Sequence, residues 1–349
     1  MSFTRLDATD FVVSADSVVS TAWSTNVPTL TNFYTSSTVT ASNAFYLNVY
    51  EANPQTTSTA QVQFSIAYGN VYGSGSKLYN PLVDGMSPSR TTYGQYRNLL
   101  YADENSLFNF GAGCTASFDM IAINVDRNRY KESIFPGTLK LTLGNTTNTI
   151  DLTDDSNDTS VITYLDCGRV YNIVSGSYGN ATTSKPSAAP NVAGGYTPSG
   201  SYGLFLPDIG TIILNPRALA LPYVSGGLGV VWDTSSNPNL PTSSVNNVAF
   251  LNTMLSGSCF QLNSQETVSA NYVFVRVKNS EYNYTSNPSF LSGSTGELIY
   301  PTLVYSPQTF PTTVGLYNDN NELLAVAKMS RPLKKDFTKE CLIKIKLDW

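Results

Sequence analysis

The 349-residue sequence contains no histidine. This absence excludes Ser-His-Asp and Cys-His nucleophile systems, histidine general bases and most catalytic zinc sites. Carboxylate chemistry remains possible, since a glycoside hydrolase needs only two Asp or Glu side chains about 5 to 10 Å apart. None of the 25 acidic residues has a recognisable acid–base context, and Asp166 and Asp208 are candidates only through their aromatic neighbourhood. We therefore predict a non-enzymatic protein without a cofactor.

Charged residues are the second shortage, at 13% of the chain against roughly 25% in a typical soluble protein. The formal net charge is −5, and the one basic cluster, between residues 331 and 339, alternates with Asp336 and Glu340. A nucleic-acid binder needs clustered Lys and Arg to release the counterions of a phosphate backbone. We therefore predict no nucleic-acid partner.

The four cysteines are widely separated and form no C-x-x-C pair; they are Cys114, Cys167, Cys259 and Cys341. Because closely spaced ligands and histidine are both missing, we expect no metal site. The first residues show neither the basic region nor the apolar core of a signal peptide, and no window approaches the roughly 18 apolar residues of a membrane helix. We expect a protein made in a cytosol, without a membrane partner and with four free thiols.

In place of charge the sequence carries many Ser, Thr and Asn residues, together with 22 Tyr and 16 Phe. β-Branched and aromatic side chains suit a pleated, half-buried surface, and 24 Gly with 18 Pro supply frequent turns. This composition predicts a mostly β fold of antiparallel, sandwich-like cores, with two short accessory helices and long loops.

Hydrophobic periodicity places the elements along the chain. Val62, Phe64, Ile66 and Tyr68 alternate with polar or small residues, which predicts a strand with one buried face. Apolar residues at helical spacing predict helices over 89–102 and 245–255, with a helical turn at 216–221. Further extended segments are expected at 10–19, 44–50, 118–125, 138–143, 161–174, 204–214 and 272–278.

Changes in composition divide the chain into five predicted segments. Residues 1–60 hold an extended arm with the first strands, and 61–174 form a β domain with one helix. A flexible Ser/Gly/Pro-rich loop at 175–203 precedes a second β domain with one helix at 204–309, and 310–349 form a hairpin plus a terminal strand that completes a sheet. An arm that orders only on a neighbouring subunit is the alternative for residues 1–60.

The last forty residues have the pattern of one β module. Alternating apolar residues predict strands at 313–317 and 322–328, joined by an Asn-Asp-Asn-Asn turn at 318–321. A final amphipathic strand ends at Trp349. Such a module has to pack on another surface. Its candidate interface residues are Tyr317, Asn318 and Trp349.

Three polar segments have alternative interpretations. The connection at 126–135 holds basic and acidic residues side by side, so it is either a charged turn or an ion-paired interface patch with Tyr130 and Lys131 as candidates. The acidic segment at 151–158 favours a solvated turn, because it lacks the central Gly and the spacing of a calcium loop. Gly73-Ser74-Gly75 favours a plain loop over a phosphate cradle, because no helix signal follows directly.

Eight blocks of the sequence carry a family resemblance: FTRLDATDFV at 3–12, YGQYRNL at 93–99, RYKE at 129–132, FPGT at 135–138, YGLFLPD at 202–208, PTTVGLYND at 311–319, ELLAVAK at 322–328 and KLDW at 346–349. Together they resemble virion structural proteins of T-even-like cyanophages, which are contractile-tailed phages of cyanobacteria. The resemblance implies a component of the tail or baseplate and supplies no catalytic residues.

The expected function follows from this resemblance and from the low charge. We expect a non-enzymatic structural subunit of a contractile-tailed cyanophage virion, tail- or baseplate-associated, made in the host cytoplasm. Its partners would be other virion structural proteins and further copies of itself, repeated in a 3- or 6-fold arrangement. The alternatives are a neck or head-decoration component, or a tail protein whose tyrosines bind a host surface glycan.

Overall fold

The structure is a computed structural model that describes residues 3–35, 46–73, 89–110, 116–158, 162–182, 190–191, 195–196, 202–233, 244–285 and 287–348. The chain forms two compact units. Unit 2 is Val18–Glu266, whereas unit 1 combines Met1–Ser17 with Thr267–Trp349 and so contains both ends of the given sequence. The five predicted segments differ from this division, because strands from 61–174 and from 204–266 share one sheet.

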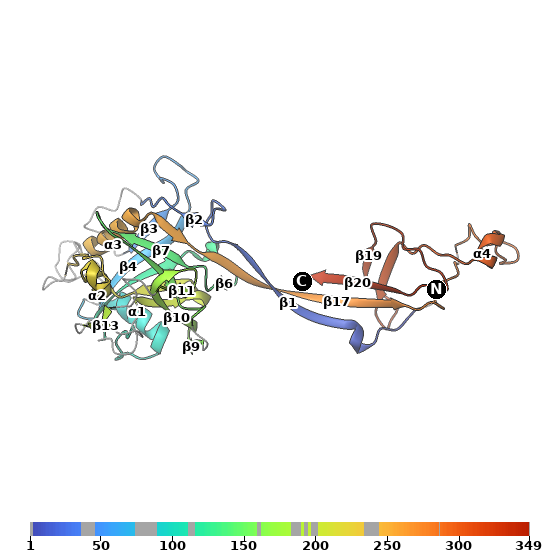
Figure 1. The fold of residues 1–349 in the computed structure, drawn as a ribbon, viewed down its shortest axis with the longest axis horizontal. Helices are drawn as coiled ribbons and strands as arrows, with labels where there is room; N and C mark the ends of the chain where they lie inside the picture. The colour runs from blue at the N-terminus through green and yellow to red at the C-terminus, as the bar shows by residue number, and fades with distance from the viewer. Residues whose placement is uncertain are drawn as a thin grey trace. The chain divides into compact units, whose positions relative to one another are not determined.

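The main sheet of unit 2 has twelve strands, and its strand pairs among the described residues are all antiparallel, which confirms the predicted mostly β, antiparallel fold. Figure 1 labels several of these strands, among them β3, β4, β7 and β10. Ten strands follow one path: β2 (Thr29–Leu30), β16 (Cys259–Gln261), β7 (Lys140–Gly144), β8 (Thr149–Asp154), β10 (Gly168–Ser177), β14 (Gly203–Leu206), β15 (Thr211–Leu214), β5 (Asp119–Val125), β4 (Val62–Asn70) and β3 (Tyr46–Tyr50). The short strands off this path or outside the sheet are β6 (Ser133–Ile134), β9 (Thr163–Leu165), β11 (Asn180–Ala181), β12 (Pro190–Asn191) and β13 (Gly195–Tyr196).

Strand alternation gives this sheet a separate core on each face. In β5, Ile121, Ile123 and Val125 belong to one hydrophobic cluster, whereas Met120 and Ala122 belong to the other. Successive side chains of a strand point to opposite faces, so a continuous apolar run can fill two cores at once. The chain itself therefore covers both faces of the central strands of unit 2.

The larger core lies between the two ends of the sheet. Helix α3 (Ser244–Gly257) packs against β7 and β8 and also against β3 and β4, which stand at opposite ends of the strand order. The sheet therefore curls until its end strands face each other, as the predicted sandwich-like core requires. Phe64 of β4 contacts Phe260 of β16 and Trp23 inside this core, with ring centroids 5.2 Å and 6.3 Å apart.

Helix α1 (Ser89–Tyr101) contributes to the smaller core and confirms the helix predicted at 89–102. It lies close to β4, where Gly69 is required: a Cβ atom there would come within 2.9 Å of the Tyr93 backbone nitrogen. The short α2 (Pro216–Ala220) begins at the cap residue Asn215, whose side chain accepts a hydrogen bond from the Arg217 N–H.

Most of a second, four-stranded sheet belongs to unit 1. The long β17 (Asn263–Val277) is its central strand, with β1 (Phe11–Thr21) on one side and β20 (Cys341–Asp348) on the other. β20 pairs antiparallel with β17 over eight residues, from Ala270 opposite Asp348 to Val277 opposite Cys341. The hairpin of β18 (Thr313–Tyr317) and β19 (Leu323–Lys328) confirms the two strands predicted there.

Some predicted elements have other bounds in the structure. β17 starts nine residues before the predicted strand at 272–278, because its polar first half hides the alternation. Helix α4 (Pro301–Tyr305) was not predicted, since its Leu-Val-Tyr run favours a strand by composition. Most of the predicted loop at 175–203 lies outside the described residues, although β10 and β11 extend into it.

Candidate functional site

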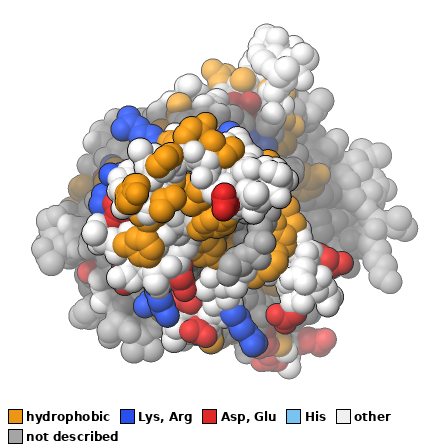
Figure 2. Space-filling model, turned by 90° about the vertical axis from the view of Figure 1, so that its right-hand side faces the viewer, with side chains coloured by type: hydrophobic (Ala, Val, Ile, Leu, Met, Phe, Trp, Pro, Cys, Tyr) orange, Lys and Arg blue, Asp and Glu red, His pale blue; other side chains and the backbone are white. Residues whose placement is uncertain are grey.

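Unit 1 exposes many more large hydrophobic side chains than it buries. Among its described residues, three hydrophobic side chains are buried, whereas seventeen large ones are exposed; in unit 2 the corresponding numbers are forty-four and fourteen. We call the exposed set the apolar surface of unit 1: Phe3, Phe11, Val12, Val13, Tyr282, Tyr284, Ile299, Tyr300, Val304, Tyr305, Phe310, Tyr317, Leu323, Leu324, Val326, Phe337 and Leu342. Figure 2 shows hydrophobic side chains gathered on the face it presents, with most charged ones toward its margin. Apolar side chains that gather on one exposed face are typical of an interaction site.

The β18–β19 hairpin presents one half-buried face and one exposed face. Val314 pairs with Ala327 and Leu316 with Ala325, and these four side chains are all half-buried. On the other face Val326 is exposed, and Leu324 beside the strand irregularity is 68% exposed. The hairpin therefore keeps Leu324 and Val326 exposed on an apolar outer face.

The turn of this hairpin is fixed by one side chain. Asn318 Oδ1 accepts hydrogen bonds from the backbone nitrogens of Asn320 and Glu322, at 3.0 Å and 2.8 Å. Its Nδ2 donates to the Glu322 carboxylate at 2.6 Å. Asn321 adopts a left-handed backbone with φ of 61°, as the predicted Asn-rich turn requires. Asn318 thus shapes the end of the exposed face.

Tyr317 lies on the exposed side of the hairpin. Its ring covers Gly315, where a Cβ atom would come within 2.8 Å of the ring. The ring also meets Phe3 edge to face, with the centroids 5.1 Å apart. This contact brings the beginning of unit 1 against its hairpin and makes both rings part of the apolar surface.

A lysine takes the place of an apolar core in the loops of unit 1. Lys335 is 0% exposed, and its Nζ donates to the Asn279 backbone oxygen at 2.9 Å, to Asn283 Oδ1 at 3.0 Å and to the Asp336 backbone oxygen at 3.0 Å. The Lys335 and Thr309 backbones exchange two hydrogen bonds of 2.9 Å. A buried ammonium is tolerated only when its donors are used, so this side chain ties its own segment to the loop that holds Asn279 and Asn283.

A shallow depression of about 450 Å³ lies beside α4. It is lined by Ser289, Phe290, Tyr300, Thr302, Leu303, Ser306 and Gln308, so none of its lining residues carries a charge. Phe290 and Tyr300 meet edge to face with centroids 5.4 Å apart. Aromatic rings beside hydroxyl and amide groups suit a neutral, hydroxyl-rich ligand.

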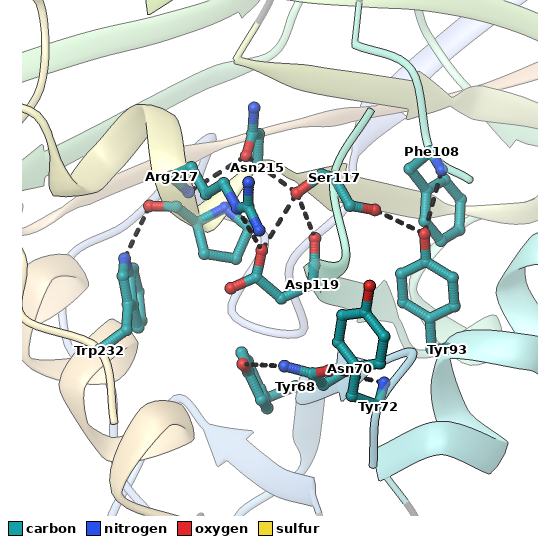
Figure 3. Close-up of polar contacts among 11 residues, drawn as sticks. Tyr68, Asn70, Tyr72, Tyr93, Phe108, Ser117, Asp119, Asn215, Arg217 and Trp232 are labelled. Carbon is teal, nitrogen blue, oxygen red and sulfur yellow. Dashed lines mark hydrogen bonds and ion pairs between the residues drawn. The ribbon is translucent and has the colours of Figure 1, made fainter. Parts of the chain in front are cut away.

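Unit 2 holds a buried polar network at the start of β5 (Figure 3). The Ser117 hydroxyl lies 2.9 Å from the Asp119 backbone oxygen and 3.1 Å from its Oδ1. Arg217 Nε lies 3.5 Å from the same Oδ1, and its guanidinium stands over the Phe118 ring. Burial raises the pKa of Asp119, although Arg217 and Ser117 act in the opposite direction.

Two tyrosines adjoin this network. Tyr93 donates to the Ser117 backbone oxygen at 2.6 Å and accepts from the Phe108 N–H at 3.1 Å. Asn70 Nδ2 donates to the Tyr68 hydroxyl at 3.1 Å. Burial raises the pKa of both phenols, so they stay neutral. We interpret the network as a structural tie between β4, β5 and α2.

The carboxylate candidate Asp208 is engaged in an ion pair. Its Oδ1 lies 2.6 Å from Arg169 Nη2 and 3.0 Å from Nε, and its Oδ2 accepts from the Arg169 backbone N–H at 2.8 Å. Burial pushes the pKa of Asp208 upward, but the hydrogen bonds from Arg169 outweigh it and leave the pKa below its usual value. A carboxylate held ionised in this way is poorly suited to donate a proton.

The structure places the five predicted interface residues differently. Tyr130 is 7% exposed and packs its ring against Gly210 under the Arg127 guanidinium, so it has a packing role in unit 2. Lys131 is exposed and lies 3.8 Å from the Glu266 carboxylate. Tyr317 and Asn318 belong to the hairpin, whereas Trp349 lies outside the described residues. The interface roles of all five stay predictions.

Sequence reasoning missed Lys335 and the aromatic residues around α4. A buried lysine in a basic segment has no signal of its own, because its neighbours Lys334 and Lys339 are exposed. The pair Phe290 and Tyr300 meets only through the folding of a loop. The one available signal was the high tyrosine content, which indicates a contact surface without locating it.

The acidic segment and three of the four thiols lie among the described residues. Asp154 is buried, which raises its pKa, and its Oδ2 accepts the Gly137 N–H at 2.7 Å. Among the described residues no three His, Cys, Asp or Glu side chains form a group that could hold a metal ion. Cys167, Cys259 and Cys341 are free thiols. Cys114 and part of Gly73-Ser74-Gly75 lie outside the described residues.

Comparisons with known proteins identify no relative: no protein-family model, curated protein or solved structure matches the chain. None of the helices in the described part of the chain has the length and hydrophobicity needed to cross a bilayer.

Proposed function

We propose that this chain is a non-enzymatic structural subunit of a contractile-tailed cyanophage virion, at the baseplate or elsewhere on the tail. It acts through protein–protein contacts, and unit 1 supplies them. The observation that carries the proposal is the contrast between three buried and seventeen exposed large hydrophobic side chains among the described residues of unit 1. A β sheet with so little core gains stability when another protein surface covers it.

The composition of unit 1 supports an interface in a permanent assembly. Obligate interfaces are more hydrophobic than transient ones and resemble a domain core cut in half. Aromatic residues are enriched in interface cores, whereas Lys, Glu and Asp are depleted. The apolar surface of unit 1 contains nine aromatic side chains. In a 3- or 6-fold arrangement, weak contacts of this kind reinforce one another.

The place in a phage tail rests on the sequence blocks that resemble cyanophage virion proteins. Four blocks, at 3–12, 311–319, 322–328 and 346–349, fall in unit 1. The proposed location is therefore the virion, after synthesis in the host cytoplasm. A neck or head-decoration position would use the same surface, and the particle itself decides between them.

The test uses purified particles of the phage that encodes this chain. We expect quantitative mass spectrometry to find a copy number divisible by three, and cross-links from Lys328, Lys344 or Lys346 to reach other virion proteins or other copies. A particle that lacks the chain would refute the proposal. Replacing Leu324→Asp and Val326→Asp should lower incorporation at least about tenfold, because it buries charge in an apolar contact.

A matched control keeps this test specific. Leu99 is also an exposed leucine, but it belongs to α1 of unit 2. Leu99→Asp should leave incorporation unchanged. Equal losses from the unit 1 and unit 2 variants would point to a general folding defect and would remove the support for unit 1.

Glycan binding is a second candidate function, favoured by the uncharged depression beside α4. Aromatic rings with hydroxyl and amide groups around about 450 Å³ could hold a neutral saccharide. The whole chain should then bind a neutral polysaccharide on a glycan array, and Tyr300→Ala should abolish this binding. Tyr282→Ala, an exposed tyrosine outside the depression, is the control. An array without signal would leave this second function unsupported.

A further inference from the structure

The outer edge of β1 is an open place for strand addition in the described chain. β1 pairs on one side with β17, and no other described strand is placed against it. A long, exposed edge strand is a template for pairing with another chain unless Lys, Pro or a bulge protects it. β1 has eleven residues, contains no Lys, Pro or Gly, and carries one charge, Asp16. The opposite edge strand, β20, carries Lys344 and Lys346.

The sequence of β1 is suited to pairing with itself. In an antiparallel pair related by a two-fold axis, one residue must face its own copy. If that residue is Ala15, Phe11 faces Val19, Val12 faces Val18, Val13 faces Ser17 and Ser14 faces Asp16 of the other copy. Apolar residues then pair at both ends, and a hydroxyl donor faces each carboxylate. Moving the centre by one residue toward the C-terminus would place Asp16 against its own copy.

Charge favours a second copy over a strongly charged partner. Unit 1 contains ten Lys and Arg against ten Asp and Glu, so its net charge is zero. Two such units meet without net repulsion, whereas a surface of one sign would select a partner of the opposite sign. Most soluble oligomers are homo-oligomers, and an isologous contact of this kind closes as a dimer.

We propose that β1 of one copy pairs antiparallel with β1 of a second copy of this chain, centred on Ala15. The pairing would join two four-stranded sheets into one across their unprotected edges. This inference rests on the proposed function, because it names one partner of the surface through which the subunit would assemble. Dimers related in this way can repeat in a 6-fold particle.

The first test traps the register in the full chain. Facing Cβ atoms of an antiparallel pair lie about 4.5–5.5 Å apart, so Ala15→Cys should form an intermolecular disulfide on mild oxidation. Val13→Cys is the matched control, because in this register its two copies stand four residues, or about 14 Å, apart along the strands. The unaltered chain under the same oxidant reports any background from the native cysteines. Equal cross-linking of both variants would overturn the register.

The second test introduces charged residues at one predicted cross-strand pair. Val12 and Val18 are both exposed, so lysine at both positions should not disturb the fold of one copy. Val12→Lys with Val18→Lys should weaken the dimer about 10- to 100-fold in sedimentation equilibrium, because like charges then face each other twice. Val12→Lys with Val18→Glu should restore it. Equal dimer dissociation constants for the two double variants would contradict the pairing.

These outcomes separate the inference from the proposed function. A full chain that is monomeric at every concentration overturns β1 self-pairing. If cross-links in the purified particle still join unit 1 to other virion proteins, the structural role stands and only the partner changes. If the particle lacks the chain, the structural role fails, whatever the isolated chain does in solution.

Discussion

Unit 2 and unit 1 are built from the same kind of sequence, but they use it in opposite ways. In unit 2 the alternating side chains of β5 fill two cores, one on each face of the sheet. In unit 1 the alternating side chains of β18 and β19 leave Leu324 and Val326 exposed. Alternation therefore shows that a strand has an apolar face, but it does not show whether the chain itself covers that face.

The largest expected difference between the units lies in their response to losing an aromatic ring. Phe64→Ala should lower the free energy of unfolding of unit 2 by about 3–5 kcal/mol, because it empties the space between Trp23 and Phe260. Phe310→Ala, an exposed position in unit 1, should cost under about 0.5 kcal/mol in dilute solution. Urea unfolding followed by tryptophan fluorescence measures both. Similar losses would erase the contrast between the units.

The second effect concerns the polar centre of unit 1. Lys335→Met should destabilise these loops by about 2–3 kcal/mol, because three acceptors, among them the buried Asn283 Oδ1, lose their donor. Hydrogen exchange at the amides of Thr309 and Lys335, which bond each other's backbone, should accelerate about 30-fold or more. Lys334→Met, on an exposed neighbour, is the control. Unchanged exchange in the Lys335 variant would show that an apolar side chain serves equally well.

A third effect tests the ion pair of unit 2. Asp208→Asn should cost about 1–2 kcal/mol at pH 7, since it removes charged hydrogen bonds from Arg169. The folded pKa of Asp208 lies below its usual value. Its contribution is therefore full above about pH 4, the unfolded pKa, and is lost as the pH falls through the folded pKa. The difference in the free energy of unfolding between wild type and the Asp208→Asn variant should shrink toward low pH. A difference that does not change with pH would contradict the ion pair.

The smallest effect has the opposite sign. Burial raises the pKa of Asp119, so the folded state favours its neutral form. Its contribution to stability should fall as the pH rises from the unfolded pKa of about 4 through the folded pKa. As the pH rises through this range, the free energy of unfolding of the Asp119→Asn variant should increase relative to that of the wild type. Urea unfolding at several pH values measures this difference. If the variant instead loses stability relative to the wild type as the pH rises, the effect of Arg217 on the pKa of Asp119 is larger than the effect of burial.

Local patterns explain which parts of the fold could be predicted from the sequence. The strand at 62–68 and the helix at 89–102 were found because their periodicity lies in neighbouring residues. The division into units could not be found, since β1 and β20 join the same sheet from opposite ends of the sequence. The polar first half of β17 and the β-branched run in α4 also gave misleading local signals.

The candidate surface was predictable only in part. The sequence indicated that the module at 310–349 needs a partner, and the hairpin there does expose apolar residues. It did not indicate that Tyr130 is buried, because burial depends on the distant Gly210. Nor did it reveal Lys335, whose acceptors on Asn279 and Asn283 lie more than fifty residues away in the sequence. Contacts between distant segments carry this information, and no short pattern encodes them.

Solvent accessibility of unit 1 in the assembled particle tests the central claim most directly. Hydroxyl-radical footprinting can compare Tyr305, Leu324 and other side chains of the apolar surface in intact virions and in the isolated chain. The account predicts strong protection of these side chains in the virion, with little change at Tyr164 and Tyr223, which are exposed in unit 2. Equal labelling of the apolar surface in both states would contradict the claim that unit 1 is the assembling part of the molecule.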